Sequence, residues 1–222
     1  MSGPRPTAGD TPRTPSSAPS RTDTRRYGWA VGLLAAALAI GFLAYTLGSH
    51  ASGSTGIPTG KPLRFFAAPL AASTLGGDAN VNPPCTAARH DPRALNVCLM
   101  VMRAPLVLAF FVTDSRGCER EVDTLQALAR RQALRGARFA AVAVNTSHAA
   151  AAKAVRAHHW TIPVAYDADG AVGALYGVTA CPLLELAERG GTVAQRLIGE
   201  HWLNRDALGA RVRTLLETPA SK

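Results

Sequence analysis

The chain has 222 residues, enough for one mid-sized domain with additional segments. Hydrophobic residues make up 47% of the sequence, so a packed core can form. The formal net charge is +9, and it comes largely from arginine. These arginines are dispersed and form no basic stripe with interleaved aromatic side chains, so nucleic acid is not an expected partner.

The N-terminal part of the chain changes abruptly in composition. Residues 1–26 are rich in Pro, Ser, Thr, Gly and Arg and have almost no large apolar side chains, which predicts a disordered tail. Residues 27–48 are 22 residues without a charge, enough to cross a hydrocarbon core of roughly 30 Å. We therefore predict a retained transmembrane anchor. The alternative is a cleaved signal peptide, whose apolar stretch would be shorter.

The charges around this stretch predict its orientation. Arg21, Arg25 and Arg26 lie just before it, whereas the following flank has no Lys or Arg until Lys61. The positive-inside rule then keeps the N-terminus cytoplasmic and the rest of the chain outside. We expect a single-pass protein of the cell membrane, with residues 49–82 as an extracytoplasmic linker and residues 83–222 as the folded domain.

All four cysteines follow the predicted anchor, and in an oxidising compartment such thiols tend to pair. Four cysteines allow three connectivities. Cys85 and Cys98 are close in sequence and flank a loop, so we expect them to form a structural disulfide. Cys118 and Cys181 are left for chemistry or for each other.

The periodicity of apolar residues predicts strands alternating with helices, followed by a hairpin and a last helix. The expected strands are 105–112, 137–145 and 161–167, the expected helices are 117–134, 149–159, 170–177 and 204–217, and the hairpin turns at Gly190-Gly191. Asn204 is expected to cap the last helix. Parallel strands linked by helices, together with an antiparallel pair, predict an α/β fold with a mixed central sheet.

Three segments in this order resemble the thioredoxin fold, most closely the membrane-tethered TlpA-like and redoxin group of extracytoplasmic thiol proteins. They are "FFVTDSRGCEREVDTLQAL", "HHWTIPVAYDADGAVGALYGV" and "GVTACPLLELAERGGTV". The resemblance covers about residues 100–217. It implies a mixed sheet flanked by helices and a cis peptide bond before Pro182.

The resemblance also implies a remodelled thiol site. The first position of the family's C-x-x-C is Ser115, while Cys118 holds the second position, at the start of a helix. Cys181 stands just before the proline, and family geometry puts that position beside the C-x-x-C. The resemblance thus implies thiol–disulfide exchange with envelope protein thiols or disulfides, using Cys118 and Cys181 as a rewired pair. Ser115 would cap the helix or donate a hydrogen bond, and Pro182 would shape the substrate groove.

Two other functions remain open. A peroxiredoxin-like peroxidase would use the Ser115-x-x-Cys118 pattern, but Phe111 replaces the family's proline and residues 176–188 contain no arginine. A non-catalytic binding or chaperone module would fit the loss of the first cysteine. The adjacent His158 and His159 have no partner spacing that completes a zinc site, so we expect neither metal nor cofactor.

Overall fold

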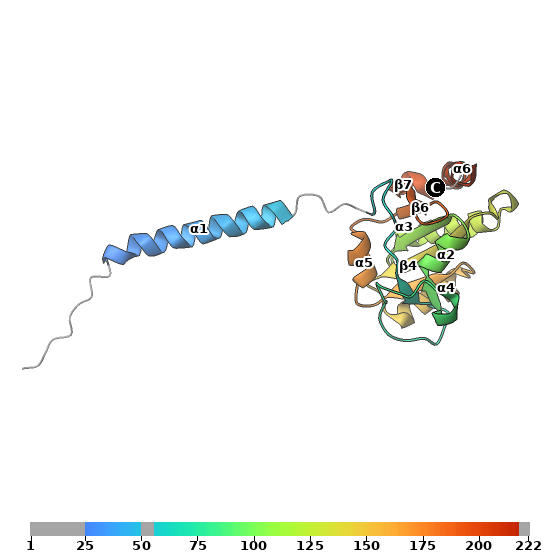
Figure 1. Ribbon diagram of the computed structural model, residues 1–222, viewed down its shortest axis with the longest axis horizontal. Helices are drawn as coiled ribbons and strands as arrows, with labels where there is room; N and C mark the ends of the chain where they lie inside the picture. The colour runs from blue at the N-terminus through green and yellow to red at the C-terminus, as the bar shows by residue number, and fades with distance from the viewer. Residues whose placement is uncertain (1–24, 50–55, 218–222) are drawn as a thin grey trace, which may run out of the picture. The chain divides into compact units, whose positions relative to one another are not determined.

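The computed structural model describes residues 25–49 and 56–217 (Figure 1). The chain divides into two units, residues 1–52 and residues 53–222. Helix α1 (Arg25–Ser49) makes up the described part of the first unit. The tail predicted over residues 1–26 lies outside the described residues, apart from the two arginines that begin α1.

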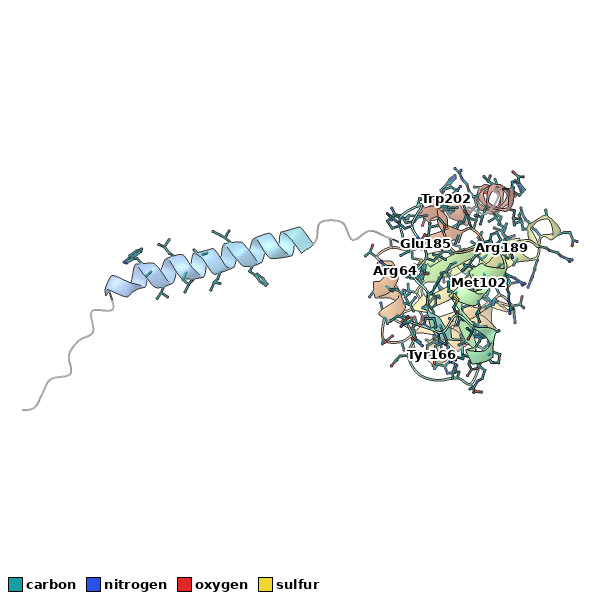
Figure 2. All side chains as sticks on the ribbon, viewed as in Figure 1. Arg64, Met102, Tyr166, Glu185, Arg189 and Trp202 are labelled. Carbon is teal, nitrogen blue, oxygen red and sulfur yellow. A yellow bond between two sulfur atoms is a disulfide. The ribbon has the colours of Figure 1, made fainter. Side chains whose placement is uncertain are left out.

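Helix α1 carries a series of exposed apolar side chains: Trp29, Val31, Leu33, Leu34, Leu38, Ile40 and Phe42. Figure 2 draws the side chains that project from this helix. Over the described residues, no helix combines the length and the apolar character needed to cross a membrane. The side chains of α1 are described for residues 28–42. The anchor over residues 27–48 stays a prediction.

The second unit is built around a five-stranded sheet with the strand order β5-β4-β3-β6-β7. The strands are β3 (Leu106–Phe111), β4 (Arg138–Val144), β5 (Val164–Asp167), β6 (Leu183–Ala187) and β7 (Val193–Ile198). Strands β3, β4 and β5 are parallel, and β6 and β7 are antiparallel to their neighbours. The mixed sheet that the sequence predicts is confirmed.

Helices cover both faces of this sheet. They are α2 (Val97–Arg103), α3 (Arg116–Ala129), α4 (His148–His158), α5 (Ala171–Tyr176) and α6 (Arg205–Glu217), with 3-10 turns at η1 (Ala87–Arg89), η2 (Gln132–Leu134) and η3 (Glu200–Leu203). Val107, Ala109 and Phe111 of β3 join the core cluster that contains α3, α4 and α6, while the alternate residues join the cluster with α2 and α5. Successive side chains of a strand point to opposite faces, which explains why β3 is buried throughout.

The linker predicted over residues 49–82 is wrong for the residues from 56 onward. Ile57, Leu63 and Phe66 are buried in the core of the domain. Strand β1 (Ala67–Pro69) pairs with β2 (Ala94–Asn96) in a small antiparallel sheet. Apolar side chains among the glycines and prolines fill one face of the central sheet, so this segment is part of the fold.

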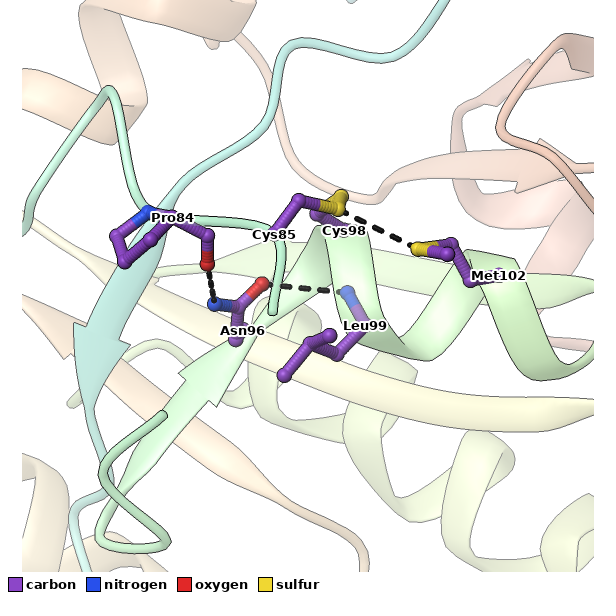
Figure 3. The surroundings of a disulfide bond; sticks show 6 residues. All are labelled: Pro84, Cys85, Asn96, Cys98, Leu99 and Met102. Carbon is purple, nitrogen blue, oxygen red and sulfur yellow. Dashed lines mark hydrogen bonds between the residues drawn. A yellow bond between two sulfur atoms is a disulfide. The ribbon is translucent and has the colours of Figure 1, made fainter. Parts of the chain in front are cut away.

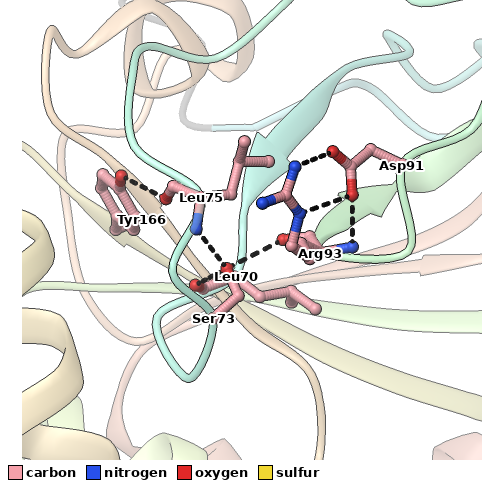
Figure 4. Close-up of polar contacts among 6 residues, drawn as sticks. All are labelled: Leu70, Ser73, Leu75, Asp91, Arg93 and Tyr166. Atoms are coloured by element: carbon pink, nitrogen blue, oxygen red, sulfur yellow. Dashed lines mark hydrogen bonds and ion pairs between the residues drawn. The ribbon is translucent and has the colours of Figure 1, made fainter.

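A loop between β1 and β2 is held by polar contacts (Figure 4). The Ser73 hydroxyl donates to the Leu70 carbonyl at 2.8 Å, and the Tyr166 hydroxyl donates to the Leu75 carbonyl at 3.1 Å. The Arg93 guanidinium pairs with Asp91 at 2.9 Å. These contacts attach the loop to β5 and to the start of β2.

One helix boundary differs from the sequence prediction, and one predicted helix cap is confirmed. The helix predicted to reach residue 134 ends at Ala129, because the backbone becomes extended at Arg131, and η2 follows as a separate turn. The predicted cap of the last helix is present. Asn204 Oδ1 accepts from the backbone N–H groups of Asp206 and Ala207 at 2.9 and 3.0 Å.

Candidate active site

The site begins where β3 ends and α3 starts. Asp114 takes a left-handed backbone conformation with φ of 60°, which turns the chain sharply. Ser115 follows at the N-cap of α3 with extended backbone angles. Its hydroxyl makes no capping bond to the backbone and instead lies 3.3 Å from the sulfur of Cys118. Ser115 was predicted either to cap the helix or to donate a hydrogen bond. In the structure its hydroxyl donates to the Cys118 sulfur and does not cap the helix.

The second part of the site is the loop that enters β6. The Cys181–Pro182 peptide bond is cis. The next residue, Leu183, pairs with Phe110 of β3, so the loop ends beside the strand that leads into α3. This topology brings together two segments that are 63 residues apart.

A disulfide joins Cys118 of α3 to Cys181 of this loop, with a Cα–Cα distance of 5.6 Å. That distance lies within the range of ordinary disulfides. Cys118 is 7% exposed, and Cys181 is only partly buried. Thus Cys118 belongs to the core, whereas Cys181 packs against the core and is the more exposed of the two residues.

Beneath this disulfide lies a buried acid, Glu121, which is 1% exposed. Its Oε2 atom is 3.7 Å from Cys181 Sγ, and its Oε1 atom has no hydrogen-bond partner among the described residues. Burial raises the pKa of Glu121 well above its usual value, and a hydrogen bond with the backbone of Leu183 opposes this in part.

Glu121 was missed by the sequence analysis, although the pattern contained a signal. Cys118, Glu121 and Leu125 are spaced by three and four residues, so they share one face of α3. That face is the buried one. The signal in the sequence is that Glu121 is an acid on the apolar face of a helix, one turn after a cysteine.

Polar contacts also surround the exposed side of α3. His158 Nδ1 lies 3.1 Å from Asp123, and His158 Nε2 lies 3.6 Å from Glu119. Glu119 in turn accepts from the backbone N–H of Asp114 at 3.1 Å. The Trp160 indole donates to the same Asp123 carboxylate at 2.7 Å. The described residues contain no group of three or more His, Cys, Asp or Glu that would hold a metal ion.

A small groove opens beside the site, with a volume of about 230 Å³. The carboxyl ends of β3 and β4 and the loop of residues 178–181 line it. Cys181 belongs to this lining, and Cys118 does not. The lining has no charged side chain, since its polar members are Asn145 and Thr179.

The remaining two cysteines form a second disulfide near the start of α2 (Figure 3). Cys85 and Cys98 have a Cα–Cα distance of 5.7 Å, and Cys98 is 1% exposed. Met102 Sδ lies 3.4 Å from Cys85 Sγ. Asn96 fixes the surrounding chain, because it accepts from the N–H of Leu99 and donates to the carbonyl of Pro84.

Comparisons with known proteins agree with this architecture. Residues 95–196 match the model of the AhpC/TSA family. No curated relative matches the chain.

Several solved structures share the fold. One carries the name thiol:disulfide interchange protein DsbE, from Chlorobium tepidum, with a TM-score of 0.57 and 18% identity over 72% of this chain and 99% of that chain. Peroxidoxin BcpB from Mycobacterium tuberculosis has a TM-score of 0.55 and 18% identity over 75% and 99%. A structure named for protein disulfide isomerase, from Bacteroides thetaiotaomicron, has a TM-score of 0.55 and 12% identity over 74% and 95%. At these identities the likeness is one of fold.

Proposed function

We propose that this protein exchanges thiols and disulfides through Cys118 and Cys181. The proposal draws on the match of residues 95–196 to the model of the AhpC/TSA family and on the thioredoxin-like fold. The observation that carries the proposal is the bond between these two sulfurs, formed between a helix N-terminus and the loop before a cis proline. In the group that the sequence resembles, the reactive sulfurs lie at the start of this helix and the cis proline packs against them.

The surroundings of the disulfide fit such an exchange. When the bond is reduced, one sulfur must carry negative charge as a thiolate, which is the reactive form. Cys118 lies in the first turn of α3, where the unpaired backbone N–H groups and the helix dipole favour a negative charge. The Ser115 hydroxyl, 3.3 Å away, adds a donor to the same sulfur.

Glu121 supplies a proton acceptor on the other side of the pair. Its carboxylate is 3.7 Å from Cys181 Sγ, close enough to exchange a proton with that thiol directly or through one water. A buried carboxyl group whose pKa is raised well above its usual value is a better proton acceptor at physiological pH than an exposed one. The role of Glu121 is to take the proton from the Cys181 thiol when the disulfide forms and to return it when the disulfide is reduced.

Peroxide reduction is the second candidate, because the matching family model is that of AhpC/TSA. The residues near Cys118 fit it less well. Phe111 occupies the place of the expected proline, and residues 176–188 contain no arginine to stabilise the peroxide. The cysteine expected to attack peroxide is also the more buried one, at 7% exposure.

We also propose that α1 anchors the protein in the cell membrane, with the domain on the extracytoplasmic side. The support is the uncharged stretch of residues 27–48 and the arginines that precede it. Four cysteines in two disulfides fit an oxidising compartment. The partners would be thiols or disulfides of envelope proteins.

An insulin reduction assay with dithiothreitol as the electron source tests the function. We expect the purified full chain to accelerate reduction, and a Cys118→Ser/Cys181→Ser variant to lose this acceleration. The matched control is Cys85→Ser/Cys98→Ser, which removes the other disulfide and retains the activity. Consumption of hydrogen peroxide, measured on the same samples, distinguishes the peroxidase. Equal activity of the first variant and the wild type would leave only a binding role.

A further inference from the structure

We propose that Cys181, and not the helix cysteine Cys118, forms the mixed disulfide with the partner. This inference rests on the exchange function proposed above. It assigns the attacking role to the residue before the cis proline and the resolving role to the residue in the helix.

Access to the two sulfurs favours this order. Cys118 is buried, whereas Cys181 is partly exposed and lines the groove between the ends of β3, β4 and its own loop. The neighbours Thr179 and Ala180 are exposed, so the loop leaves room on that side. A partner sulfur must reach the sulfur that it attacks, and of the two cysteines Cys181 is the more exposed.

The contacts of each sulfur point to the same order. Attack on Cys181 expels Cys118, so the leaving group should be the better stabilised thiolate. A Cys118 thiolate is stabilised by the backbone N–H groups in the first turn of α3 and by the hydroxyl of Ser115. Cys181 has instead the Glu121 carboxyl group, a proton acceptor and not a stabiliser of negative charge.

The exchange balances in both directions. A partner thiolate attacks Cys181 Sγ, the Cys118–Cys181 bond breaks, and Cys118 leaves as a thiolate. A second partner thiolate then attacks the partner sulfur of the mixed disulfide and releases Cys181, which takes a proton from Glu121. The partner dithiol is thereby oxidised to a disulfide, and the protein gains two electrons. In reverse, Cys181 attacks a partner disulfide and Cys118 resolves the mixed disulfide.

Two single variants of the full chain separate the roles, with oxidised glutathione as the probe. Cys118→Ser leaves Cys181 without its resolving sulfur, so we expect one glutathione to accumulate on Cys181. Cys181→Ser should form its adduct at least about tenfold more slowly, because Cys118 is buried. Intact mass measures the rate, and peptide mapping locates the adduct. Circular dichroism and an intact Cys85–Cys98 bond show that each variant is folded.

A measurement on the wild type avoids any effect of the substitutions. The oxidised protein is mixed with reduced glutathione and quenched with acid at short times, and the glutathione-bearing peptide is identified. We expect the peptide with Cys181. Predominance of the peptide with Cys118, together with faster modification of the Cys181→Ser variant, would overturn the assignment and leave the exchange function intact. Absence of any adduct at either cysteine would overturn both.

Discussion

The Oε2 atom of Glu121 lies 3.7 Å from the Sγ atom of Cys181, although the two residues belong to different elements 60 residues apart. The acid comes from the buried face of α3 and the sulfur from the loop before Pro182. This relationship connects a proton-binding group directly to the disulfide. We therefore expect the chemistry of Cys181 to depend on the protonation of this one buried side chain.

Replacing that acid should slow the exchange. In Glu121→Gln the side chain keeps its shape but cannot take the proton from Cys181, so we expect the attack on oxidised glutathione to slow by about tenfold or more near neutral pH. The rate of adduct formation in a Cys118→Ser background measures this. Glu119→Gln is the matched control on the same helix, since Glu119 contacts Asp114 and His158 instead of a sulfur. An equal loss in both variants would argue against the role of Glu121.

Ser115 should help Cys118 to leave as a thiolate when the Cys118–Cys181 disulfide is reduced. Its hydroxyl lies 3.3 Å from that sulfur, and a hydrogen bond to a charged group contributes about 1.5–3 kcal/mol. We expect Ser115→Ala to slow reduction of the Cys118–Cys181 bond by glutathione by roughly tenfold. Modification of Cys181 in the Cys118→Ser background should not change. A slower reaction there as well would show that the substitution disturbs the whole loop.

A second buried acid, Glu185 of β6, should make stability depend on pH. Burial raises its pKa to about 7, although the backbone N–H of Ile57 and the charge of Arg196 oppose this. The folded state therefore holds the proton more tightly than the unfolded state does. The stabilisation is fully present below the usual pKa of 4.5 and is lost as the pH rises through about 7.

Glu185→Gln isolates this contribution, because glutamine mimics the protonated acid at every pH. We expect the wild type to lose on the order of 1–3 kcal/mol of unfolding free energy between pH 5 and pH 8 relative to the variant. Urea unfolding at both pH values measures the difference. Glu200→Gln, at an exposed position, is the control that should follow the wild type. A parallel loss in all three proteins would contradict the prediction.

The Cys85–Cys98 disulfide should stabilise the domain without taking part in the exchange. Its 13-residue separation corresponds to about 3 kcal/mol in the loop-entropy model. We expect Cys85→Ser/Cys98→Ser to lose roughly that much unfolding free energy and to retain insulin reduction under native conditions. Loss of the activity in a folded variant would give this bond a role in electron transfer.

The membrane anchor can be tested on the full chain. Leu38 lies near the middle of α1 with an exposed side chain, and an arginine there would cost about 2.5–3.5 kcal/mol in a membrane. We expect the wild type to stay in the membrane fraction after carbonate extraction and Leu38→Arg to be released in larger part. Leu38→Ile should behave as the wild type. Release of the wild type itself would contradict the anchor.

The sequence predicted the order of strands and helices in the C-terminal part because the apolar periodicity there is strong. It failed for residues 56–82, where single apolar side chains such as Phe66 stand among glycines and prolines and show no period. Only tertiary packing reveals that they are buried. The short helix α2 was missed for the same reason, since seven residues give too little periodicity.

The two cysteines of the candidate site were expected to be neighbours from a resemblance, whereas their unequal exposure could not be read from the sequence. It depends on the tertiary packing of the loop of residues 178–181, in which Thr179 and Ala180 are exposed. Glu121 was missed although the sequence places an acid on an apolar helix face, and its contact with Cys181 depends on the same loop. Contacts between side chains of distant segments can be predicted only when the three-dimensional fold is known.

The most direct measurement of the central idea is a comparison of the two disulfides within the same native molecule. The folded full chain is titrated with dithiothreitol, free thiols are alkylated, and peptide mapping follows each bond separately. We expect Cys118–Cys181 to open first, completely and reversibly, at a dithiothreitol concentration at least about tenfold below that needed for Cys85–Cys98. If both bonds open together, and only when urea unfolds the domain, Cys118–Cys181 is a structural lock and the exchange function is contradicted.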